Sequence, residues 1–302
     1  MGERFDRRQL GKTGLQVSPL GIGGGSGISS EDVLYAFDHG INYFFFSSDL
    51  HHSSYQYSSQ ALRKLCRCGS LVREQVILAT VTYVNDPEKL VAILIDQFSE
   101  LKIDYIDIFH WGWVTDSTNM SPLLKSAHML KCDGPDHQAL RQICQIATEV
   151  NTELLRRGLV RYVGASFHSR AKARTWMNEL DVMMLRYNIA HLGMEEEIVP
   201  FLYEDKDLDP GIVVFNSAHD RIGSFHIPPP GCARHQYIPS IPDCYRFALT
   251  NPWVDMVLTG MRNRKEIDQA LTALEQGPLT AEECLNMREY GAFYKAQISL
   301  RN

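Results

Sequence analysis

The sequence predicts a (β/α)8 barrel, an α/β fold of the TIM-barrel class, and two observations carry the prediction. Eight short apolar runs alternate with helical patterns along the 302 residues. The runs are apolar almost throughout, which is typical of parallel strands buried on both faces. Eight β/α units in a row favour a closed barrel over an open doubly wound sheet. We therefore expect a single barrel domain over residues 1–302.

In chain order, the expected strands are Pro19–Ile22, Ile41–Phe46, Val76–Val81, Tyr105–His110, Val160–Ser166, Val182–Tyr187, Ile212–Ser217 and Val254–Thr259. The helices between them have start signals. Ser30 begins one, Asp86 before Pro87 is an N-cap followed by proline, and Ser169 caps a third. A capping box at Thr280 predicts an extra C-terminal helix.

Composition narrows the class of protein. The net charge of −6 gives no pull toward nucleic acid or an anionic membrane. The seven cysteines are scattered, and only Cys66 and Cys68 lie close together, so we expect reduced thiols and a cytoplasmic location. The N-terminus has no apolar segment of the signal-peptide kind, and no apolar run reaches the roughly 18 residues of a membrane span.

Two connections are long enough to shape a pocket at the C-terminal end of the barrel. They run from about Trp111 to Asp136 and from about His219 to Pro239. Their aromatic residues suggest a flat or apolar small-molecule ligand; the oligomeric state stays open.

Several segments stand in the order found in aldo/keto reductases, which this chain resembles from about Arg8 to Gly291. They include an opening hairpin at Arg8–Ser18, the strand Val160–Ser166 followed by Phe167-His168, and Thr259-Gly260-Met261-Arg262. The resemblance implies a hairpin across the barrel floor, NADP as cofactor and reduction of a small carbonyl or imine compound.

The family's catalytic residues are partly replaced. A tyrosine donates the proton, a lysine lowers its pKa, an aspartate pairs with the lysine, and a histidine orients the carbonyl. Phe45 stands at the aspartate position and Val81 at the lysine position. The loss of the aspartate and the lysine together is physically consistent, because a buried lysine without its partner carboxylate would cost several kcal/mol.

The positions of the tyrosine and the histidine stay open. An ungapped count gives Leu50 and Gly112. Tyr55 or Tyr57 takes the tyrosine's place if the loop carries an insertion. His110, two residues before Gly112, would face the same side of an ideal strand, where it either orients the carbonyl or is structural.

For the cofactor, the resemblance points to Ser166, which would hold the nicotinamide amide, with Asn188, Asn216 and Ser217 nearby. Phe167 and Met184 stand where the family has an asparagine and a glutamine, and Asn216 replaces the stacking aromatic residue. Arg262, Asn263 and Arg264 either bind a phosphate at a helix N-terminus or form a solvated turn.

Polar residues gather at the predicted strand ends and suggest an acid/base pocket. Among them, Asp49 and His168 are catalytic candidates; the others are His51, His52, Tyr83, His110, His191 and His219. No metal-ligand spacing occurs, so we expect no metal site. Three functions follow: an NAD(P)H-linked oxidoreductase with an altered catalytic set, a non-redox lyase, cyclase or isomerase using the histidines, or a non-catalytic barrel that binds a ligand or partner.

Overall fold

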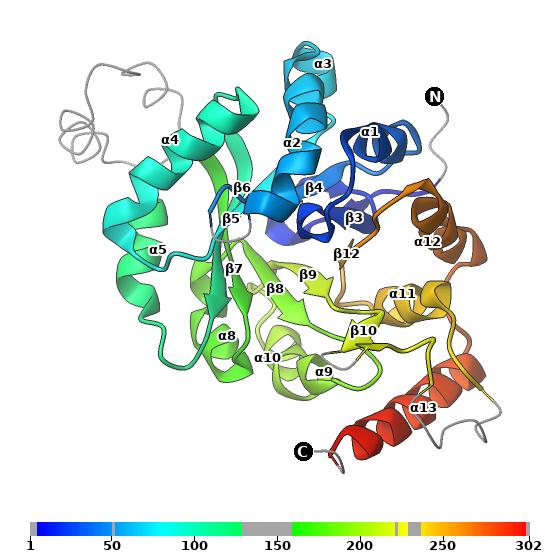
Figure 1. Cartoon of the computed structure of the whole chain (residues 1–302). Coiled ribbons are helices and arrows are strands. Elements are labelled where there is room, and N and C mark those ends of the chain that lie inside the picture. Colours follow the sequence, from blue (N-terminus) through cyan, green and yellow to red (C-terminus); the bar gives the residue numbers. More distant parts are fainter. Residues whose placement is uncertain (1–4, 50–51, 129–158, 221–222, 229–236, 300–302) are drawn as a thin grey trace, which may run out of the picture.

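The computed structural model describes residues 5–49, 52–128, 159–220, 223–228 and 237–299. Eight parallel strands close into a barrel, in the order β12-β3-β4-β5-β6-β7-β8-β9, with helices around it (Figure 1). The strands are β3 (Leu20–Gly23), β4 (Tyr43–Phe46), β5 (Ile77–Thr82), β6 (Ile106–Val114), β7 (Val160–Phe167), β8 (Val182–Arg186), β9 (Gly211–Phe215) and β12 (Met256–Thr259). The predicted (β/α)8 fold is confirmed.

Strand bounds agree with the sequence prediction to within two residues, except at one end of β6. That strand continues four residues past His110 to Val114, and its pairing with β7 is irregular between Trp111 and Val114. Trp113 adopts a left-handed backbone conformation there, with φ of 60°. His110 therefore lies inside the strand and not at its end.

The helices begin where the capping residues predict. Ser29 caps α1, Asp86 caps a 3-10 turn at Pro87–Lys89 that leads into α4, and Ser169 caps α8. The helices are α1 (Ser30–Asp38), α2 (His52–Arg67), α3 (Ser70–Arg73), α4 (Leu90–Leu101), α5 (Met120–His128), α8 (Arg170–Trp176), α9 (Gly193–Glu197), α10 (Val199–Glu204), α11 (Ile241–Thr250), α12 (Arg264–Gln276) and α13 (Ala281–Ser299).

A short hairpin crosses the floor of the barrel, at the N-terminal ends of the strands. It consists of β1 (Arg8–Gln9) and β2 (Gln16–Val17) in antiparallel pairing. Leu10 between them is wholly buried, and the Lys12 amide donates to the carbonyl of Asp209 just before β9. The predicted N-terminal hairpin is thus confirmed.

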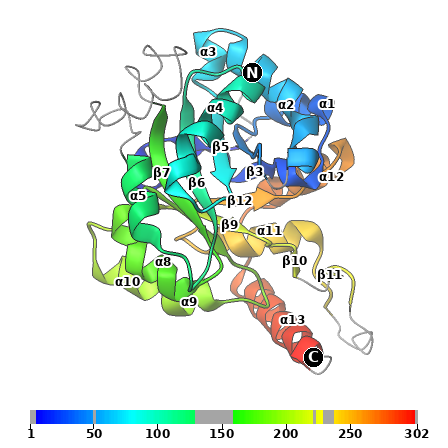
Figure 2. The same cartoon turned by 60° about the vertical axis from the view of Figure 1, so that its left-hand side comes forward.

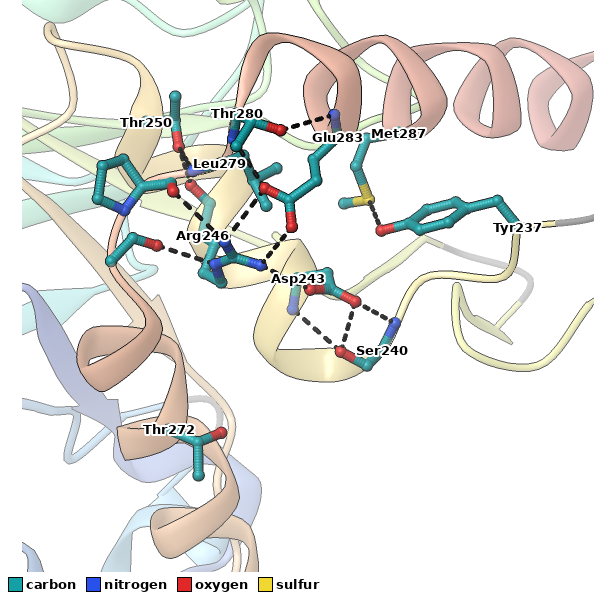
Figure 3. A network of polar contacts seen from close by, with 12 residues as sticks. Tyr237, Ser240, Asp243, Arg246, Thr250, Thr272, Leu279, Thr280, Glu283 and Met287 are labelled. Atoms are coloured by element: carbon teal, nitrogen blue, oxygen red, sulfur yellow. Dashed lines mark hydrogen bonds and ion pairs between the residues drawn. The ribbon is translucent and has the colours of Figure 1, made fainter.

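The extra C-terminal helix α13 lies beside a second hairpin, formed by β10 (His219–Asp220) and β11 (Gly223–Ser224) (Figures 1 and 2). Tyr290 Oη of α13 donates to the carbonyl of Phe225, 2.8 Å away. The capping box at Thr280 forms, and Arg246 of α11 binds Glu283 in the first turn of α13 (Figure 3).

Within the described residues, the two long connections hold α5 and the β10–β11 hairpin. The described ranges leave out residues 129–136 and 229–236 of these connections. They also leave out Cys132, Cys144, Cys232, His51 and the side chain of His52. Of the helices described, none has the length and apolar character that a membrane crossing requires.

Candidate active site

A cavity of about 920 Å³ opens at the C-terminal ends of the strands. Its size falls in the range of small-molecule and cofactor sites. Its walls come from many strand ends and from the helices behind them, and include Gly23, Phe45, Ser166, Met184, Phe215 and Thr259. In (β/α)8 enzymes this is the end at which the active site lies.

Tyr55 of α2 reaches the cavity over the turn that follows β3. Its ring lies so close to this turn that a Cβ atom at Gly24 would be 2.8 Å from it, and one at Gly25 would be 3.1 Å from the hydroxyl. Only residues without a side chain fit there. The ring packs edge-on against Phe46 and is 4% exposed, and burial raises the pKa of Tyr55 well above its usual value.

Tyr83, which follows β5, lies next to Tyr55 in the cavity wall. The two hydroxyl oxygens are 3.2 Å apart, a distance at which either can donate a hydrogen bond. Burial raises the pKa of Tyr83 as well. Both phenols are therefore protonated and uncharged near neutral pH.

Tyr57, the other candidate for the tyrosine's place, does not reach the cavity. It is 59% exposed on α2, two residues after Tyr55, and does not line the pocket. Residues two apart on a helix point in different directions, so only one of the two tyrosines can face the barrel. Of the two tyrosines that the sequence left open, only Tyr55 therefore lies in the cavity wall.

Asp49 holds the loop between β4 and α2 and is not among the residues that line the cavity. Its Oδ2 accepts hydrogen bonds from Thr82 Oγ1 at 2.6 Å and from the amide of Tyr83 at 2.8 Å, while Oδ1 accepts from Ser47 Oγ at 2.7 Å. The carboxylate is thus occupied by structure, which corrects its expected catalytic role. It fixes the segment that carries Tyr83.

His110 lies in the barrel core beneath the cavity. Its side chain is wholly buried, its Nδ1 is 3.3 Å from the Thr80 carbonyl, and the edge of its ring meets Phe45. It does not line the cavity. Of the two roles that the sequence left open for His110, its position favours the structural one, because β6 is longer than predicted and the imidazole packs against Phe45.

His168 stands at the rim after β7, exposed and facing the cavity. Its ring lies 6.0 Å from that of Trp113 on one side and 6.0 Å from that of Phe215 on the other. Trp113 in turn meets the Tyr83 ring edge-on at 6.2 Å. Four rings from four strand ends therefore form an aromatic arc along the mouth.

The nicotinamide-binding candidates divide into two groups. Ser166, Asn216 and Ser217 line the cavity, and Asn216 has a left-handed backbone with φ of 57°. Asn188 does not line the cavity. Its side-chain amide donates to the Asn216 carbonyl, and its Oδ1 accepts from the backbone amides of Ala190 and His191. Asn188 therefore shapes the turn after β8, and its expected cofactor contact is corrected.

Phe215 is a site residue that sequence reasoning missed. It ends β9, faces the cavity and offers a ring one residue before the position where an aromatic side chain was expected. Its signal was present as an aromatic residue at a predicted strand end. The one-residue offset could not be read without the left-handed turn at Asn216.

At the far end of the cavity, the predicted cluster at the α12 N-terminus is largely neutralised. Glu266 accepts hydrogen bonds from the amide and the guanidinium of Arg262, at 2.9 and 3.0 Å. Burial acts to raise the pKa of Glu266, but the hydrogen bonds from Arg262 outweigh it, and the pKa lies below its usual value. Arg262 and Glu266 line the cavity.

The other two members of the cluster do not line the cavity. Asn263 caps α12 through the Glu266 amide. Arg264 lies beside Glu31 and Asp32 of α1, at 3.8 and 3.6 Å. Of the two alternatives for this cluster, the positions of Asn263 and Arg264 favour the exposed turn over a phosphate site.

The residues at one end of the cavity fit a nicotinamide cofactor best. Ser166 and Asn216 offer a hydroxyl and an amide in the cavity that Phe215 also lines, a set suited to a flat carboxamide ring, whereas the Ser217 hydroxyl already donates to the Tyr187 carbonyl. The Arg262 end offers a cation already paired with a carboxylate. Among the described residues, no group of three or more histidine, cysteine or acidic side chains is placed to hold a metal ion.

Comparisons with known proteins agree with the fold. Residues 29–216 match the model of the aldo/keto reductase family. An aldo-keto reductase from Bacillus halodurans in its holo form superposes with a TM-score of 0.69 at 20% identity, covering 95% of this chain and 96% of that one.

A second solved structure has a similar fold. The aldo/keto reductase from Klebsiella pneumoniae in complex with NADP and acetate has a TM-score of 0.65 at 14% identity, with 96% of each chain covered. No curated protein matches the chain in sequence.

Proposed function

The chain belongs to the aldo/keto reductase family, and from this premise we propose that it is an NAD(P)H-linked oxidoreductase acting on a small carbonyl or imine compound. The observation that carries the proposal is one cavity with a buried tyrosine hydroxyl on one wall and a carboxamide-binding set on another. The wall residues are Tyr55 on one side and Ser166, Phe215 and Asn216 on the other. A solved relative is in complex with NADP, which supports the choice of cofactor.

When bound, the reduced nicotinamide supplies a hydride. The chain supplies the rest: Ser166 and Asn216 bind the carboxamide, Phe215 packs on the ring, and Tyr55 donates a proton to the substrate oxygen. The aromatic arc of Tyr83, Trp113, His168 and Phe215 lies along the mouth and favours flat substrates.

The altered catalytic set predicts slow turnover. In the family, a lysine lowers the pKa of the proton-donating tyrosine, whereas burial here raises the pKa of Tyr55. A group whose pKa lies far above the working pH is a weak acid catalyst. We therefore expect measurable cofactor binding and a low kcat.

Restoring the ion pair tests the proposal. Phe45 is paired with Ala79 across the sheet, and Val81 lies two residues beyond Ala79, so the two side chains face the same side. The double substitution Phe45→Asp with Val81→Lys should raise kcat for carbonyl reduction about 10-fold or more. Titration with NADPH and NADH, followed by steady-state assays, measures both steps.

The same double variant with Tyr55→Phe is the control and should lose the gain. Bound cofactor with no gain in kcat would contradict the proposed role of Tyr55. No binding of either cofactor at millimolar concentration would contradict the oxidoreductase proposal and favour non-redox chemistry in the same cavity.

A further inference from the structure

Tyr83 lies in the space that a side chain at position 112 would need. A Cβ atom placed at Gly112 would lie 2.7 Å from Tyr83 Cδ1 and 2.7 Å from Val81 Cγ2. Gly112 and Val81 are the positions that an ungapped count assigns to the histidine and the lysine. Such a Cβ atom would also lie 2.9 Å from the Thr82 carbonyl oxygen, so the packing of Tyr83, Val81 and Thr82 around Gly112 leaves no room for a histidine there.

Three contacts fix the Tyr83 ring in this place. Asp49 accepts from its backbone amide, Gly112 leaves room beneath it, and Trp113 meets it edge-on at 6.2 Å. The left-handed backbone of Trp113, directly after Gly112, turns the indole toward the ring. The hydroxyl is held 3.2 Å from that of Tyr55, with both residues in the cavity wall.

We propose that Tyr83 is a positioning residue that replaces the family's lysine as the hydrogen-bond partner of Tyr55. The inference rests on the proposed function. In the reduction, the substrate carbon gains the hydride, the substrate oxygen gains the proton of Tyr55, and the Tyr55 oxygen is left negatively charged. Tyr83 Oη–H donates to that oxygen, and a proton from solvent then restores Tyr55.

A neutral phenol suits this site where an ammonium group does not. Phe45 has replaced the carboxylate that would balance a lysine, and an uncompensated charge in so buried a place is costly. A hydroxyl carries no net charge and still donates to the developing phenolate. A hydrogen bond to a charged group stabilises it more than one to a neutral group, so the bond strengthens as the proton leaves.

The test compares three tyrosine-to-phenylalanine variants of the full chain. Tyr83→Phe removes one hydroxyl and keeps the ring, so kcat should fall about 10- to 100-fold, while KM and the Kd of the cofactor change less than about 3-fold. Tyr55→Phe should lower kcat further. Tyr57→Phe, an exposed position on the same helix, is the matched control and should match the wild type.

A second readout does not depend on turnover. With tyrosine labelled by ¹³C at Cζ, the Tyr55 resonance should move in Tyr83→Phe and stay in Tyr57→Phe. Unchanged kcat in Tyr83→Phe, in an enzyme that Tyr55→Phe inactivates, would overturn the inference. Bound cofactor without turnover in any variant would overturn the proposed function, and an unmoved Tyr55 resonance would then overturn the tyrosine pair as well.

Discussion

His110 is a buried histidine in the barrel core with an unsatisfied ring nitrogen. Its Nε2 is buried with no hydrogen-bond partner, and only the Thr80 carbonyl lies near the other ring nitrogen. Burial lowers the pKa of His110 to about 3, so the folded protein holds a neutral imidazole. The unfolded chain protonates the same group at about pH 6.5.

The stability of the protein should therefore depend on His110 as the pH falls. Because the folded pKa is the lower one, its contribution is fully present above about pH 6.5 and is lost progressively toward pH 3. The loss amounts to at most about 1.4 kcal/mol per pH unit in that window. Denaturant unfolding of the wild type and His110→Leu at several pH values measures it.

The comparison with the variant is needed because Asp255 acts in the opposite sense. Burial raises the pKa of Asp255 to about 7, so its contribution is present below about pH 4 and is lost as the pH rises to 7. The difference in unfolding free energy between wild type and His110→Leu cancels this slope. A difference that stays constant from pH 4 to 6.5 would contradict a neutral buried His110.

At the residue scale, the sequence predicts which residues lie near the mouth of the barrel. It predicts less well which of their side chains line the cavity. Tyr55 and Tyr57 differ by two positions on one helix, and Asn188 and Asn216 follow neighbouring strands. Whether a side chain lines the cavity depends on backbone turns that shift its position by a single residue. Periodicity locates a strand end to within about two residues, which is too coarse to assign such roles.

At the element scale, three residues meet at the N-terminus of α12: Asn263 caps the helix, and Arg262 is paired with Glu266. Helix N-termini attract phosphate, and Arg262 lies at this one. Glu266, however, holds the guanidinium and places its own negative charge in the cavity wall. A carboxylate beside a dinucleotide site favours a ribose hydroxyl over the extra 2′-phosphate of NADP.

Glu266→Gln should therefore shift the cofactor preference toward NADPH. We expect the Kd for NADPH to fall about 10-fold and that for NADH to change less than about 3-fold, because a negative charge is removed from the cavity wall and Arg262 is released. Fluorescence titration with both cofactors measures the ratio. Asp268→Asn removes the same charge from an exposed position of α12 outside the cavity and is the control.

An equal change in the two dissociation constants would contradict this account of α12. So would an effect of Asp268→Asn as large as that of Glu266→Gln, since a general change in net charge would then explain both.

The elements themselves were predictable because their signals are local. Strands buried on both faces leave continuous apolar runs, and caps such as Ser29 and Ser169 satisfy amides within three residues. The extension of β6 was not predictable in this way. It depends on the left-handed backbone of Trp113 and on Gly112, where a side chain would meet Val81, Tyr83 and the Thr82 carbonyl, on and just after the neighbouring strand β5.

At the scale of the whole molecule, α13 ties the C-terminus to the cavity. Tyr290 and Tyr294 donate to the carbonyls of Phe225 and Gly223, and Gly223 lines the cavity. The position of the β10–β11 hairpin therefore depends on how firmly α13 is held, and its first turn is held by Arg246.

Arg246 makes contacts with three segments at once (Figure 3). Its guanidinium is bound to Asp243 of its own helix and to Glu283 of α13, both at 3.1 to 3.2 Å, and it donates to the carbonyls of Gly277 and Pro278 between α12 and α13. Arg246 itself is 9% exposed, whereas the side chains of its partners Asp243 and Glu283 are 22% and 36% exposed. Its removal would break several hydrogen bonds at once, which is more costly than the loss of a single surface ion pair.

Arg246→Met, which keeps the aliphatic stem, should lower the unfolding free energy by about 1–2 kcal/mol, because hydrogen bonds to partly exposed partners are lost. It should also speed hydrogen exchange in α13 and in residues 223–228, and weaken cofactor binding without touching the cavity. Arg264→Met breaks an exposed contact with Glu31 and should change stability by less than about 0.5 kcal/mol. Faster exchange confined to α11, with α13 and the hairpin unchanged, would show that Arg246 stabilises its own helix alone and that the C-terminal helix does not control the mouth of the barrel.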